Sequence, residues 1–420
     1  MFKVLKNSWA LFIGLLLIMT AHGLQGNLLG VRAVYEKFSL ISTGIMMSGF
    51  YMGYFIGAKN ILSLIHRVGH IRVFAAMASS ASLVILIHSI YVHPFTWFVA
   101  RILSGICMVG IYTIVESWFN ERSTNQTRGK VLSIYMMISY FGMGSGMLLL
   151  NFQQPESFEP FILISVLMSL SLIPILLTKR KPPSFKKIQN LTISELYKIS
   201  PLGIVSSVLT GFIHSAIFTL FAVYAASMKF TLVEIGFLTF LLTVSGALAQ
   251  FPIGYVSDLL DRRKIIAICS LLGAGAAFVL IFLSSSIFSS SFFKFLFYVF
   301  VIFYAFCSLP LFSLNLSHTN DFISKDKFVA AGAGLQFAFA LGAIAGPFVC
   351  SLFMGFIGPE GFFIFLVVGN TSIGFFALYR MKVGSVVDSK NNQFFPIPRS
   401  ITPMGMELNP AIKSEEENKV

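Results

Sequence analysis

The chain alternates between long apolar runs and short polar breaks. A helix needs about 20 residues to cross the hydrocarbon core of a bilayer, and twelve runs are close to that length or longer. The predicted spans cover residues 9–30, 40–58, 72–92, 95–118, 130–151, 160–178, 201–227, 233–257, 265–287, 293–316, 329–354 and 361–379. Because barrel strands are shorter and alternate in polarity, the pattern predicts an all-α membrane protein with twelve transmembrane helices.

A basic, proline-containing break divides the twelve spans into two sets of six. We therefore predict an N-terminal six-helix bundle (1–178), a basic cytoplasmic linker (179–200) and a C-terminal six-helix bundle (201–380). The remaining residues, 381–420, are polar and end in KSEEENKV, so we expect a disordered cytoplasmic tail.

The two sets of spans are related by a constant offset. A shift of 192 residues superposes three pairs: His22 on His214, Tyr112 on Tyr304, and Gly142 on Gly334. These matches indicate two pseudo-symmetric halves. Such halves commonly place a substrate site between them, near the middle of the membrane.

Composition and charge support this interpretation. Hydrophobic residues make up 56% of the 420 residues and charged residues only 11%, which excludes an ordinary soluble protein. The net charge is +13, but the 30 Lys and Arg residues form no contiguous patch, so we expect no nucleic-acid partner.

The distribution of the bases predicts an orientation. If the N-terminus is cytoplasmic, 25 of the 30 bases fall in cytoplasmic segments and only Arg32, Lys37, Lys229 and Lys294 lie outside. This asymmetry follows the positive-inside rule. It predicts an integral, multi-pass protein of the plasma membrane (the inner membrane of a bacterium), surrounded by lipid, with both termini in the cytoplasm.

The densest group of charges lies between the eighth and ninth spans, in GYVSDLLDRRKII (254–266). We expect Asp258 to pair with Arg262 or Arg263 and with the positive N-terminal end of a helix in the same half. Such a cluster can close one face of a rocking transporter, as a gate. The alternative is an ordinary solvated turn that obeys the positive-inside rule.

The spacing Gly254-x-x-x-Asp258-x-x-x-Arg262-Arg263 resembles the loop motif of the major facilitator superfamily (MFS), in its second-half copy. The first-half copy retains Arg67, Gly69 and Arg72. It has His66 where the family has an acid and Leu62 where the family has a glycine.

Two further stretches carry the resemblance. Arg101-x-x-x-Gly105 resembles the fourth-helix motif of MFS proton antiporters, and Glu116 with Arg128-Gly129 is similar to the residues that bracket the MFS loop between helices four and five. The context VESW resembles a poorly characterised bacterial branch. Over roughly residues 5–380, the resemblance implies the MFS fold, a small-molecule substrate, transport by alternating access and a monomer.

Few ionisable side chains fall inside the predicted spans, and such residues usually face a cavity or a partner. Arg101 is expected to face a cavity, where it would bind an anionic group or lower the pKa of a nearby acid during proton transfer. The alternative is that it extends to the outer interface. Glu116 lies about 22 Å further along the same helix. We expect it to form a gate pair with Arg128 or Arg122 rather than to carry protons.

Other polar residues are candidates for the wall of a substrate cavity. His22, Gln25 and Asn27 lie on a glycine-rich first span, and His214 has the matching place in the seventh. A histidine can titrate near physiological pH, although buried histidines are also common hydrogen-bonded packing residues. Tyr112, Asn315 and Gln336 are weaker candidates.

No cofactor, metal or enzyme activity is expected. The four cysteines lie singly in apolar runs, and the glycine-rich stretches lack the lysine of a phosphate-binding loop. We predict a secondary active transporter of a small solute, with proton-coupled efflux as the favoured form. The alternatives are a facilitated uniporter, a metabolite uptake permease, or a receptor that has a transporter fold but does not transport.

Overall fold

The structure is a computed structural model that describes residues 2–124, 126–152, 154–177, 191–287, 289–383, 393–398 and 400–412, with side chains from Ser8 onward. Twelve spans in this part of the chain are long and apolar enough to cross a membrane, which confirms the predicted number. The described residues contain helices and the turns that join them, and no strand is present among them.

The first six spans are α1 to α6: α1 (Phe2–Tyr35), α2 (Leu40–Val68), α3 (His70–Ile90), α4 (Pro94–Glu121), α5 (Arg128–Leu148) and α6 (Glu159–Leu176). The other six are α8 (Pro201–Ser227), α9 (Leu232–Leu259), α10 (Arg262–Ser286), α11 (Ser291–Ser308) with α12 (Leu311–Asn320), α13 (Phe328–Ile357) and α14 (Gly361–Val383). The tenth span is divided at Pro310, whose nitrogen has no hydrogen to continue the helical ladder.

Several helices are longer than their apolar runs. Helix α2, predicted to end at residue 58, continues to Val68 and ends at Gly69, which has a φ of 94°. A backbone at that angle favours glycine, so the sequence ends the helix there rather than at the membrane boundary. The apolar run therefore marks the part of α2 in lipid, and the glycine marks its end.

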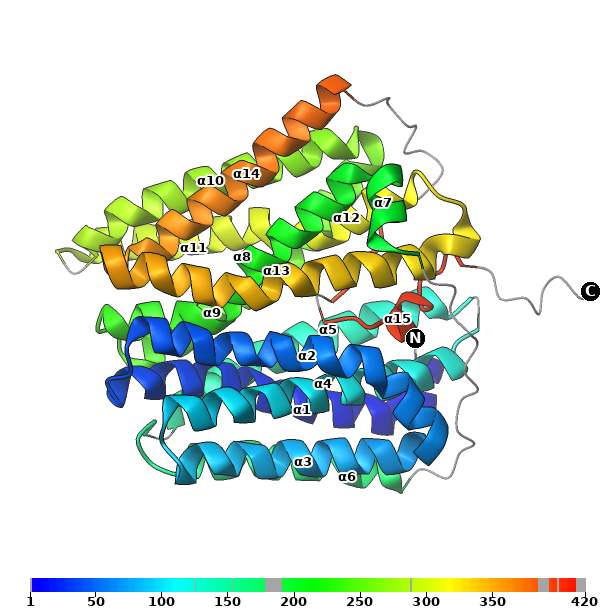
Figure 1. Ribbon diagram of the computed structural model, residues 1–420, viewed down its shortest axis with the longest axis horizontal. Coiled ribbons are helices and arrows are strands. Elements are labelled where there is room, and N and C mark those ends of the chain that lie inside the picture. Colours follow the sequence, from blue (N-terminus) through cyan, green and yellow to red (C-terminus); the bar gives the residue numbers. More distant parts are fainter. Residues whose placement is uncertain are drawn as a thin grey trace, which may run out of the picture.

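The helices form two bundles, one of α1–α6 and one of α8–α14 (Figure 1). Glycines allow very close contacts within each bundle. A Cβ on Gly146 of α5 would lie 1.9 Å from the carbonyl oxygen of Thr20 in α1. In the other bundle, a Cβ on Gly342 of α13 would lie 1.9 Å from the carbonyl oxygen of Val208 in α8.

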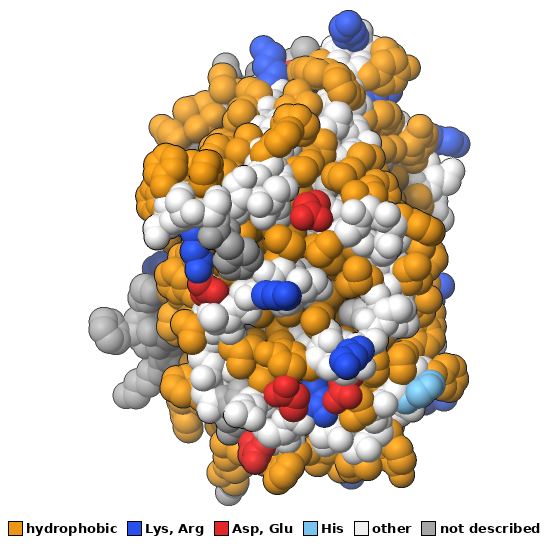
Figure 2. All heavy atoms as spheres, turned by 90° about the vertical axis from the view of Figure 1, so that its left-hand side faces the viewer, with side chains coloured by type: hydrophobic (Ala, Val, Ile, Leu, Met, Phe, Trp, Pro, Cys, Tyr) orange, Lys and Arg blue, Asp and Glu red, His pale blue; other side chains and the backbone are white. Residues whose placement is uncertain are grey.

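The start of α1 and the last described residues, up to Ile412, lie at the same end of the molecule (Figure 1). We refer to it as the predicted cytoplasmic end, and to the opposite end as the predicted extracellular end. Figure 2 shows the latter, where charged side chains are few and scattered among apolar ones. Two of the four bases predicted on that side are neutralised there, because Arg32 pairs with Glu36 and Lys294 pairs with Glu234.

The bundles contact each other directly at the predicted extracellular end. A Cβ on Gly44 of α2 would lie 2.1 Å from Oγ of Ser351 and 2.6 Å from the carbonyl oxygen of Pro347 in α13, so these helices lie very close together. Gly30 of α1 likewise lies against Val223 of α8. These contacts form what we call the extracellular seal.

The predicted disordered tail is wrong for residues 393–398 and 400–412, which we call the tail segment. This segment lies between the two bundles at the predicted cytoplasmic end, and it includes the short helix α15 (Pro403–Met406) (Figure 1). It buries six apolar side chains: Phe394, Ile397, Ile401, Met404, Met406 and Leu408. Their burial opposes the entropy cost that keeps polar tails disordered. The other residues of the predicted tail after Val383 lie outside the described residues.

The predicted linker is described only from Leu191. There, helix α7 (Ile193–Ile199) begins with a capping box in which Thr192 and Glu195 satisfy each other's backbone N–H groups. Leu196 is buried against α13 near Gly334. This part of the linker is therefore a helix packed on the second bundle.

Replacing Gly342 with valine tests the close packing of α13 on α8. The added carbons would overlap the backbone of Val208, and overpacking of this kind costs about 1–3 kcal/mol. We expect a clearly lower midpoint of thermal unfolding for the purified protein. The matched control is Gly275→Val on α10, where a Cβ would meet no atom within 4 Å. Equal midpoints for the two variants would contradict the packing described here.

Candidate substrate cavity and gating clusters

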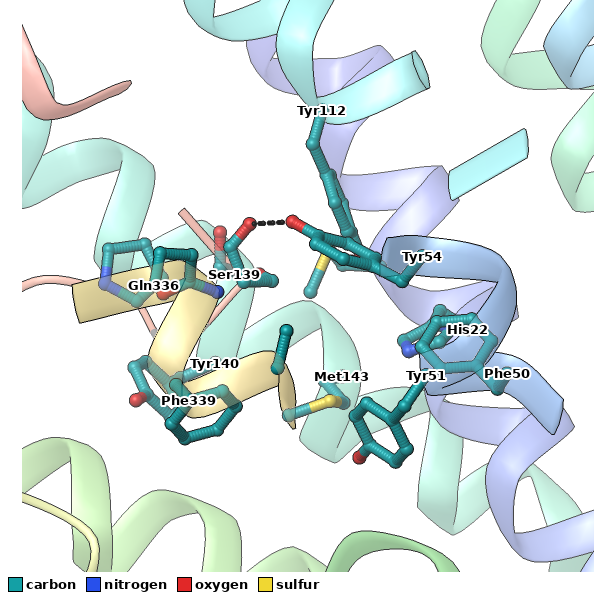
Figure 3. A pocket seen from close by; sticks show the side chains of 14 residues that line it. His22, Phe50, Tyr51, Tyr54, Tyr112, Ser139, Tyr140, Met143, Gln336 and Phe339 are labelled. Atoms are coloured by element: carbon teal, nitrogen blue, oxygen red, sulfur yellow. Dashed lines mark hydrogen bonds between the residues drawn. The ribbon is translucent and has the colours of Figure 1, made fainter. Parts of the chain in front are cut away.

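A small cavity lies between the two bundles near the centre of the molecule (Figure 3). We call it the central cavity; its volume is about 50 Å³. Helices α1, α2, α4 and α5 of the first bundle and α13 of the second supply its walls, together with two tail residues. The lining residues are Met19, His22, Phe50, Tyr51, Tyr54, Tyr112, Ser139, Tyr140, Met143, Gln336, Phe339, Ala340, Pro398 and Ser400.

A larger cavity of about 640 Å³, which we call the vestibule, extends from the central cavity toward the predicted cytoplasmic end. The two share Tyr54, Gln336 and Ala340. The vestibule lies between α2 and α13, and residues 402–404 of the tail segment form part of its wall. The route from the centre of the protein to the predicted cytoplasm therefore runs past the tail.

The opposite route is closed by the extracellular seal. Asn27 contributes to it, because its side-chain amide donates a hydrogen bond of 2.7 Å to the Thr239 hydroxyl and so joins α1 to α9 across the two bundles. Asn27 was predicted to line the substrate cavity, but the structure places it outside the central cavity, in the contact between bundles. The described conformation thus faces the predicted cytoplasm.

Arg101 lies next to the central cavity. It lines an adjoining space of about 20 Å³ together with His22, Phe50, Tyr51 and Met143, all of which also line the central cavity. The Arg101 side chain is only 2% exposed, and its guanidinium carbon lies 4.6 Å from the centre of the Phe50 ring. It therefore does not extend to the outer interface, which was the alternative interpretation of the sequence.

Three residues predicted to line the cavity are instead hydrogen-bonded away from it. The Gln25 amide lies 3.5 Å from the Ser104 hydroxyl, the His214 ring nitrogen Nε2 lies 3.0 Å from the Ser308 carbonyl oxygen, and the Asn315 amide donates to the Thr210 hydroxyl at 3.2 Å. All three are buried, and none lines the central cavity or the vestibule. The cavity prediction is wrong for these residues, since each side chain is buried and directed to a partner within the same bundle.

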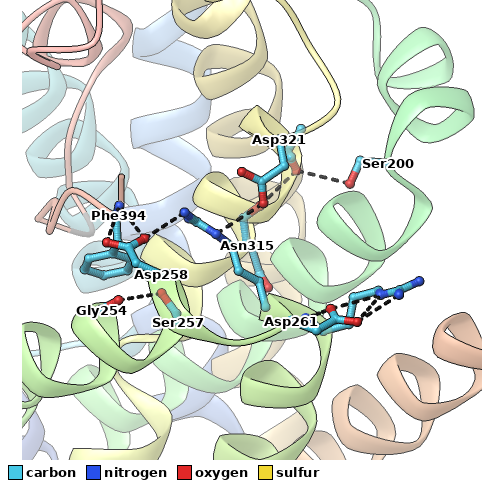
Figure 4. A network of polar contacts seen from close by, with 11 residues as sticks. Ser200, Gly254, Ser257, Asp258, Asp261, Asn315, Asp321 and Phe394 are labelled. Carbon is cyan, nitrogen blue, oxygen red and sulfur yellow. Dashed lines mark hydrogen bonds and ion pairs between the residues drawn. The ribbon is translucent and has the colours of Figure 1, made fainter. Parts of the chain in front are cut away.

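The charged loop after α9 forms a buried cluster (Figure 4). Arg262 pairs with Asp258 at 2.8 Å, as predicted, and also with Asp321 at the end of α12 at 3.2 Å. The Arg262 side chain is 1% exposed and that of Asp321 is 5% exposed. Nothing in the motif itself indicated Asp321, because the tenth span supplies it.

Asp261 caps the first turn of α10. It accepts a hydrogen bond from the backbone N–H of Arg263 and pairs with the guanidinium of that residue at 2.8 Å. Partial burial favours a higher pKa for Asp261, but these hydrogen bonds and the arginine charge outweigh it and lower the pKa below its ordinary value. The carboxyl group is therefore charged where the helix dipole also favours a negative charge.

Asp258 has a second partner that the sequence did not predict. Its carboxylate accepts hydrogen bonds of 2.8 and 3.1 Å from the backbone N–H of Phe394 in the tail segment (Figure 4). The Phe394 ring also lies against Gly254, where a Cβ would be 2.2 Å from a ring carbon. The tail thus takes the place of the helix terminus that we expected beside Asp258.

Glu116 is completely buried, and the tail segment surrounds it. Its carboxylate accepts hydrogen bonds from the Tyr135 hydroxyl at 2.6 Å, from the backbone N–H groups of Thr402 and Gly405 at 3.0 Å each, and from the Thr402 hydroxyl. The predicted pair with Arg128 or Arg122 is wrong, because tail donors occupy the carboxylate.

Arg128 contacts the tail as well. Its guanidinium donates a hydrogen bond of 3.0 Å to the Ile412 carbonyl oxygen, and the neighbouring Gly129 lies against Pro410. Glu116 and the Arg128-Gly129 pair, which bracket the loop after α4, therefore both contact the tail segment rather than each other.

The first-half loop lacks a comparable cluster. Arg67 and Arg72 are exposed and form no ion pair with any residue that the structure describes, and Gly69 serves to connect α2 to α3. With His66 in place of an acid, the arginines have no counter-charge in this loop. Within the described residues no group of three His, Cys, Asp or Glu side chains could hold a metal ion.

A sequence profile described as "Major Facilitator Superfamily" matches residues 11–246 and 203–413, which together cover nearly the whole chain. The chain belongs to the Major Facilitator Superfamily. It is therefore a membrane transporter by family and not an enzyme.

Two similar proteins are also named as MFS-type transporters. The chain is 22% identical over 363 residues to an uncharacterized MFS-type transporter, YcaD, of Escherichia fergusonii, which covers 85% of this chain and 91% of the relative. It is 23% identical over 349 residues to the uncharacterized MFS-type transporter YE1530 of Yersinia enterocolitica, with 82% and 88% coverage. Neither name states a substrate.

Solved MFS transporters share the fold. The nucleoside transporter NupG superposes with a TM-score of 0.74 at 13% identity, over 89% of this chain and 98% of NupG. A D-xylose–proton symporter superposes with a TM-score of 0.69 at 13% identity, over 91% and 98% of the two chains. At these identities the likeness shows the MFS fold alone.

Several residues that line the central cavity of this MFS chain were not predicted from its sequence. Tyr51, Tyr54 and Tyr140 line the central cavity, but they are three of 13 tyrosines in a chain that also has 46 phenylalanines. The run FYMGY at 50–54 has the i, i+4 spacing of one helix face, which was an available signal. Of the predicted cavity residues, His22, Tyr112 and Gln336 line the central cavity and Arg101 adjoins it.

Replacing Arg262 with glutamine tests the buried cluster. The substitution leaves the Asp321 carboxylate buried without its arginine, and breaking a buried pair in this way costs about 3–5 kcal/mol. We expect a marked fall in the free energy of unfolding measured by chemical denaturation. The exposed Arg72 provides the control, since Arg72→Gln should change stability by less than about 0.5 kcal/mol. Similar losses in both variants would argue against a stabilising role for the cluster.

Proposed function

We propose that this MFS protein is a secondary active transporter that moves a small solute by alternating access. The observation that supports it is a cavity between two bundles, closed by direct helix contacts at one end and continuous with a vestibule at the other. Inverting this arrangement requires the bundles to separate at the extracellular seal and to approach each other at the vestibule. Rocking of one bundle against the other achieves both changes.

The residues of the central cavity suit such a cycle because they come from both bundles. Tyr54 and Tyr112 belong to the first bundle and Gln336 to the second, so a solute that contacts all three bridges the moving parts. One chain supplies the complete cavity, which favours a monomer as the working unit. The excess of bases at the end where α1 begins and the tail segment lies supports an orientation with cytoplasmic termini in a bacterial inner membrane.

Proton-coupled efflux is the form of transport that we favour. His22 is the one ionisable imidazole among the described residues that line the central cavity, and it could change its charge as the cavity opens to either side. Glu116 suits this role less, because tail donors enclose its carboxylate away from the central cavity. The likeness of Arg101-x-x-x-Gly105 to the proton-antiporter motif is a second argument for coupling.

The experiment uses purified protein in liposomes that contain a pH-sensitive dye. Solutes that raise the thermal stability of the protein in a concentration-dependent way are identified first. Each is then loaded into the liposomes, and its efflux should be accompanied by proton entry in the wild type. His22→Gln should abolish the proton movement and leave at most downhill solute exchange.

The comparison variant is His214→Gln, whose ring lies outside the central cavity and contacts the Ser308 carbonyl oxygen. It should retain proton-linked efflux. Solute flux without proton movement in the wild type would favour the uniporter alternative. Stable binding without any flux, both in the wild type and in the tail-released variant Gly405→Val described below, would favour the receptor alternative and count against transport.

A further inference from the structure

Arg101 is a buried cation without a partner. Its Nε and Nη1 atoms are inaccessible to water, and they have no hydrogen-bond partner in the described part of the protein. None of the ion pairs formed there includes Arg101. An arginine stays charged in proteins, and an uncompensated charge in the membrane interior costs several kcal/mol.

The contact with Phe50 offsets only part of this cost. A guanidinium over an aromatic face gains about 0.5–2 kcal/mol, which is less than the cost of burying the charge. The missing compensation is a negative group beside the guanidinium. A carboxylate fits best, because the planar guanidinium can donate two parallel hydrogen bonds to its two oxygens.

The surroundings of Arg101 favour an anion over a cation. Among the described residues that line the central cavity, the space at Arg101 and the vestibule, none is Asp or Glu. Lys59 and His66 line the vestibule, so a solute that enters from the predicted cytoplasm meets bases before it reaches Arg101. A cationic solute would find no counter-charge along this path.

The remaining lining of the central cavity indicates what kind of group the solute carries beside its carboxylate. Phe50, Tyr51, Tyr54, Tyr112 and Phe339 surround the central cavity with aromatic rings. Flat apolar groups pack well against such rings. Resting on the transport function proposed above, we propose that the substrate is a small organic anion whose carboxylate binds Arg101 and whose aromatic or similarly flat body lies among these rings.

The test compares carboxylates with their neutral amides. Sodium benzoate and 3-phenylpropionate, the two corresponding amides, and sodium chloride are titrated against the full-length protein while thermal unfolding is followed. At least one carboxylate should bind with an apparent Kd at least tenfold lower than its amide. If the tail occupies part of the cavity, it raises the apparent Kd of each acid and of its amide by the same factor. The ratio of the two Kd values is therefore unaffected.

Arg101→Gln should remove this tenfold preference, Arg101→Lys should retain part of it, and the exposed Arg72→Gln should leave it unchanged. Equal affinities for acid and amide in the wild type, or a preference that persists in Arg101→Gln, would overturn the proposal. Protection by chloride equal to that by the carboxylates would assign the site to inorganic anions and overturn the organic class. Thermal unfolding measures binding and does not depend on transport. A protein that prefers the carboxylate over its amide but shows no flux would therefore count only against the transport function. A protein that transports a solute but shows no such preference would count only against this inference.

The tail segment supports a second and independent inference. It is hydrogen-bonded to both bundles: Glu116 and Tyr54 of the first bundle bind Thr402 and Ser400, whereas Asp258 of the second binds Phe394. Ser313, also in the second bundle, lies within hydrogen-bond distance of Ile397. The segment therefore lies between the predicted cytoplasmic ends of the two bundles, beside the vestibule, and contacts both bundles (Figure 1).

The bundles cannot close at this end while the tail is between them. Pro398 and Ser400 reach the wall of the central cavity, and the Tyr54 hydroxyl donates a hydrogen bond of 2.8 Å to the Ser400 carbonyl oxygen (Figure 3). Alternating access requires the cytoplasmic ends to approach each other, so the tail must leave first. We infer that the tail segment is an autoinhibitory wedge that holds the transporter in its cytoplasm-facing state.

Gly405 provides a way to release the wedge in the full-length chain. A Cβ there would lie 2.6 Å from the carboxyl carbon of Glu116 and 2.5 Å from Ile401, so Gly405→Val is incompatible with the docked tail. The readout is a single cysteine at Ser351, which is 0% exposed in the extracellular seal. The four native cysteines, all buried, are replaced by serine in this background.

Gly405→Val should raise the rate at which a membrane-impermeant maleimide labels this cysteine at least tenfold, because it favours the outward-facing state. Gly275→Val is the control and should not change the rate. Equal labelling rates in Gly405→Val and the control background would overturn the wedge.

A disulfide provides the opposite test. A Cβ on Gly129 would lie 3.7 Å from Cβ of Pro410, a separation within the disulfide range, so Gly129→Cys with Pro410→Cys can fix the tail in place. Oxidation should abolish labelling at Ser351→Cys and solute flux, and reduction should restore both. Persistent labelling after oxidation would also exclude the wedge. A different outcome would separate the two proposals. If no variant shows flux but Gly405→Val and the disulfide still change the labelling of Ser351→Cys, the result would count against the transport function and not against the wedge.

Discussion

Hydrocarbon offers no hydrogen-bond partner, so every polar group inside the spans must find one within the protein. This constraint accounts for most polar contacts of the bundles. Asn315 binds Thr210, His214 binds Ser308, and Asn370 contacts Tyr304, each within the second bundle. Asn27 and Thr239 satisfy each other across the two bundles. Many serine and threonine hydroxyls bind a carbonyl of their own helix, as Thr113 binds Val109, and these amides and histidines bind a neighbouring helix. Arg101 is informative because no described hydrogen bond or ion pair compensates its charge.

The same constraint explains how much of the molecule could be predicted from its sequence. The number and class of the spans follow from the length of the apolar runs, since a helix must satisfy its own backbone in lipid. The family resemblance rests on the spacing from Gly254 to Arg263 and on few other positions. Asp258 and Arg262 could be paired from this spacing because they are one helical turn apart.

The substrate cavity was harder to predict, because its walls depend on which face of each helix meets the other bundle. His22 and His214 are equivalent by sequence offset, yet only the first lines the central cavity, since the second meets a carbonyl group of α11. The contacts of Glu116 were beyond sequence reasoning for another reason. Its tail partner Thr402 lies 286 residues further along the chain, in a segment whose polar composition suggested disorder.

The position of the tail segment also has a consequence for biogenesis. A chain is synthesised from its N-terminus, so the helices of both bundles leave the ribosome before residues 393–412 do. The segment buries its apolar side chains against helices from both bundles, and its binding cleft exists only after those bundles have met. Insertion of the tail is therefore the last step of maturation, and a newly made molecule passes through a period in which its cleft is empty.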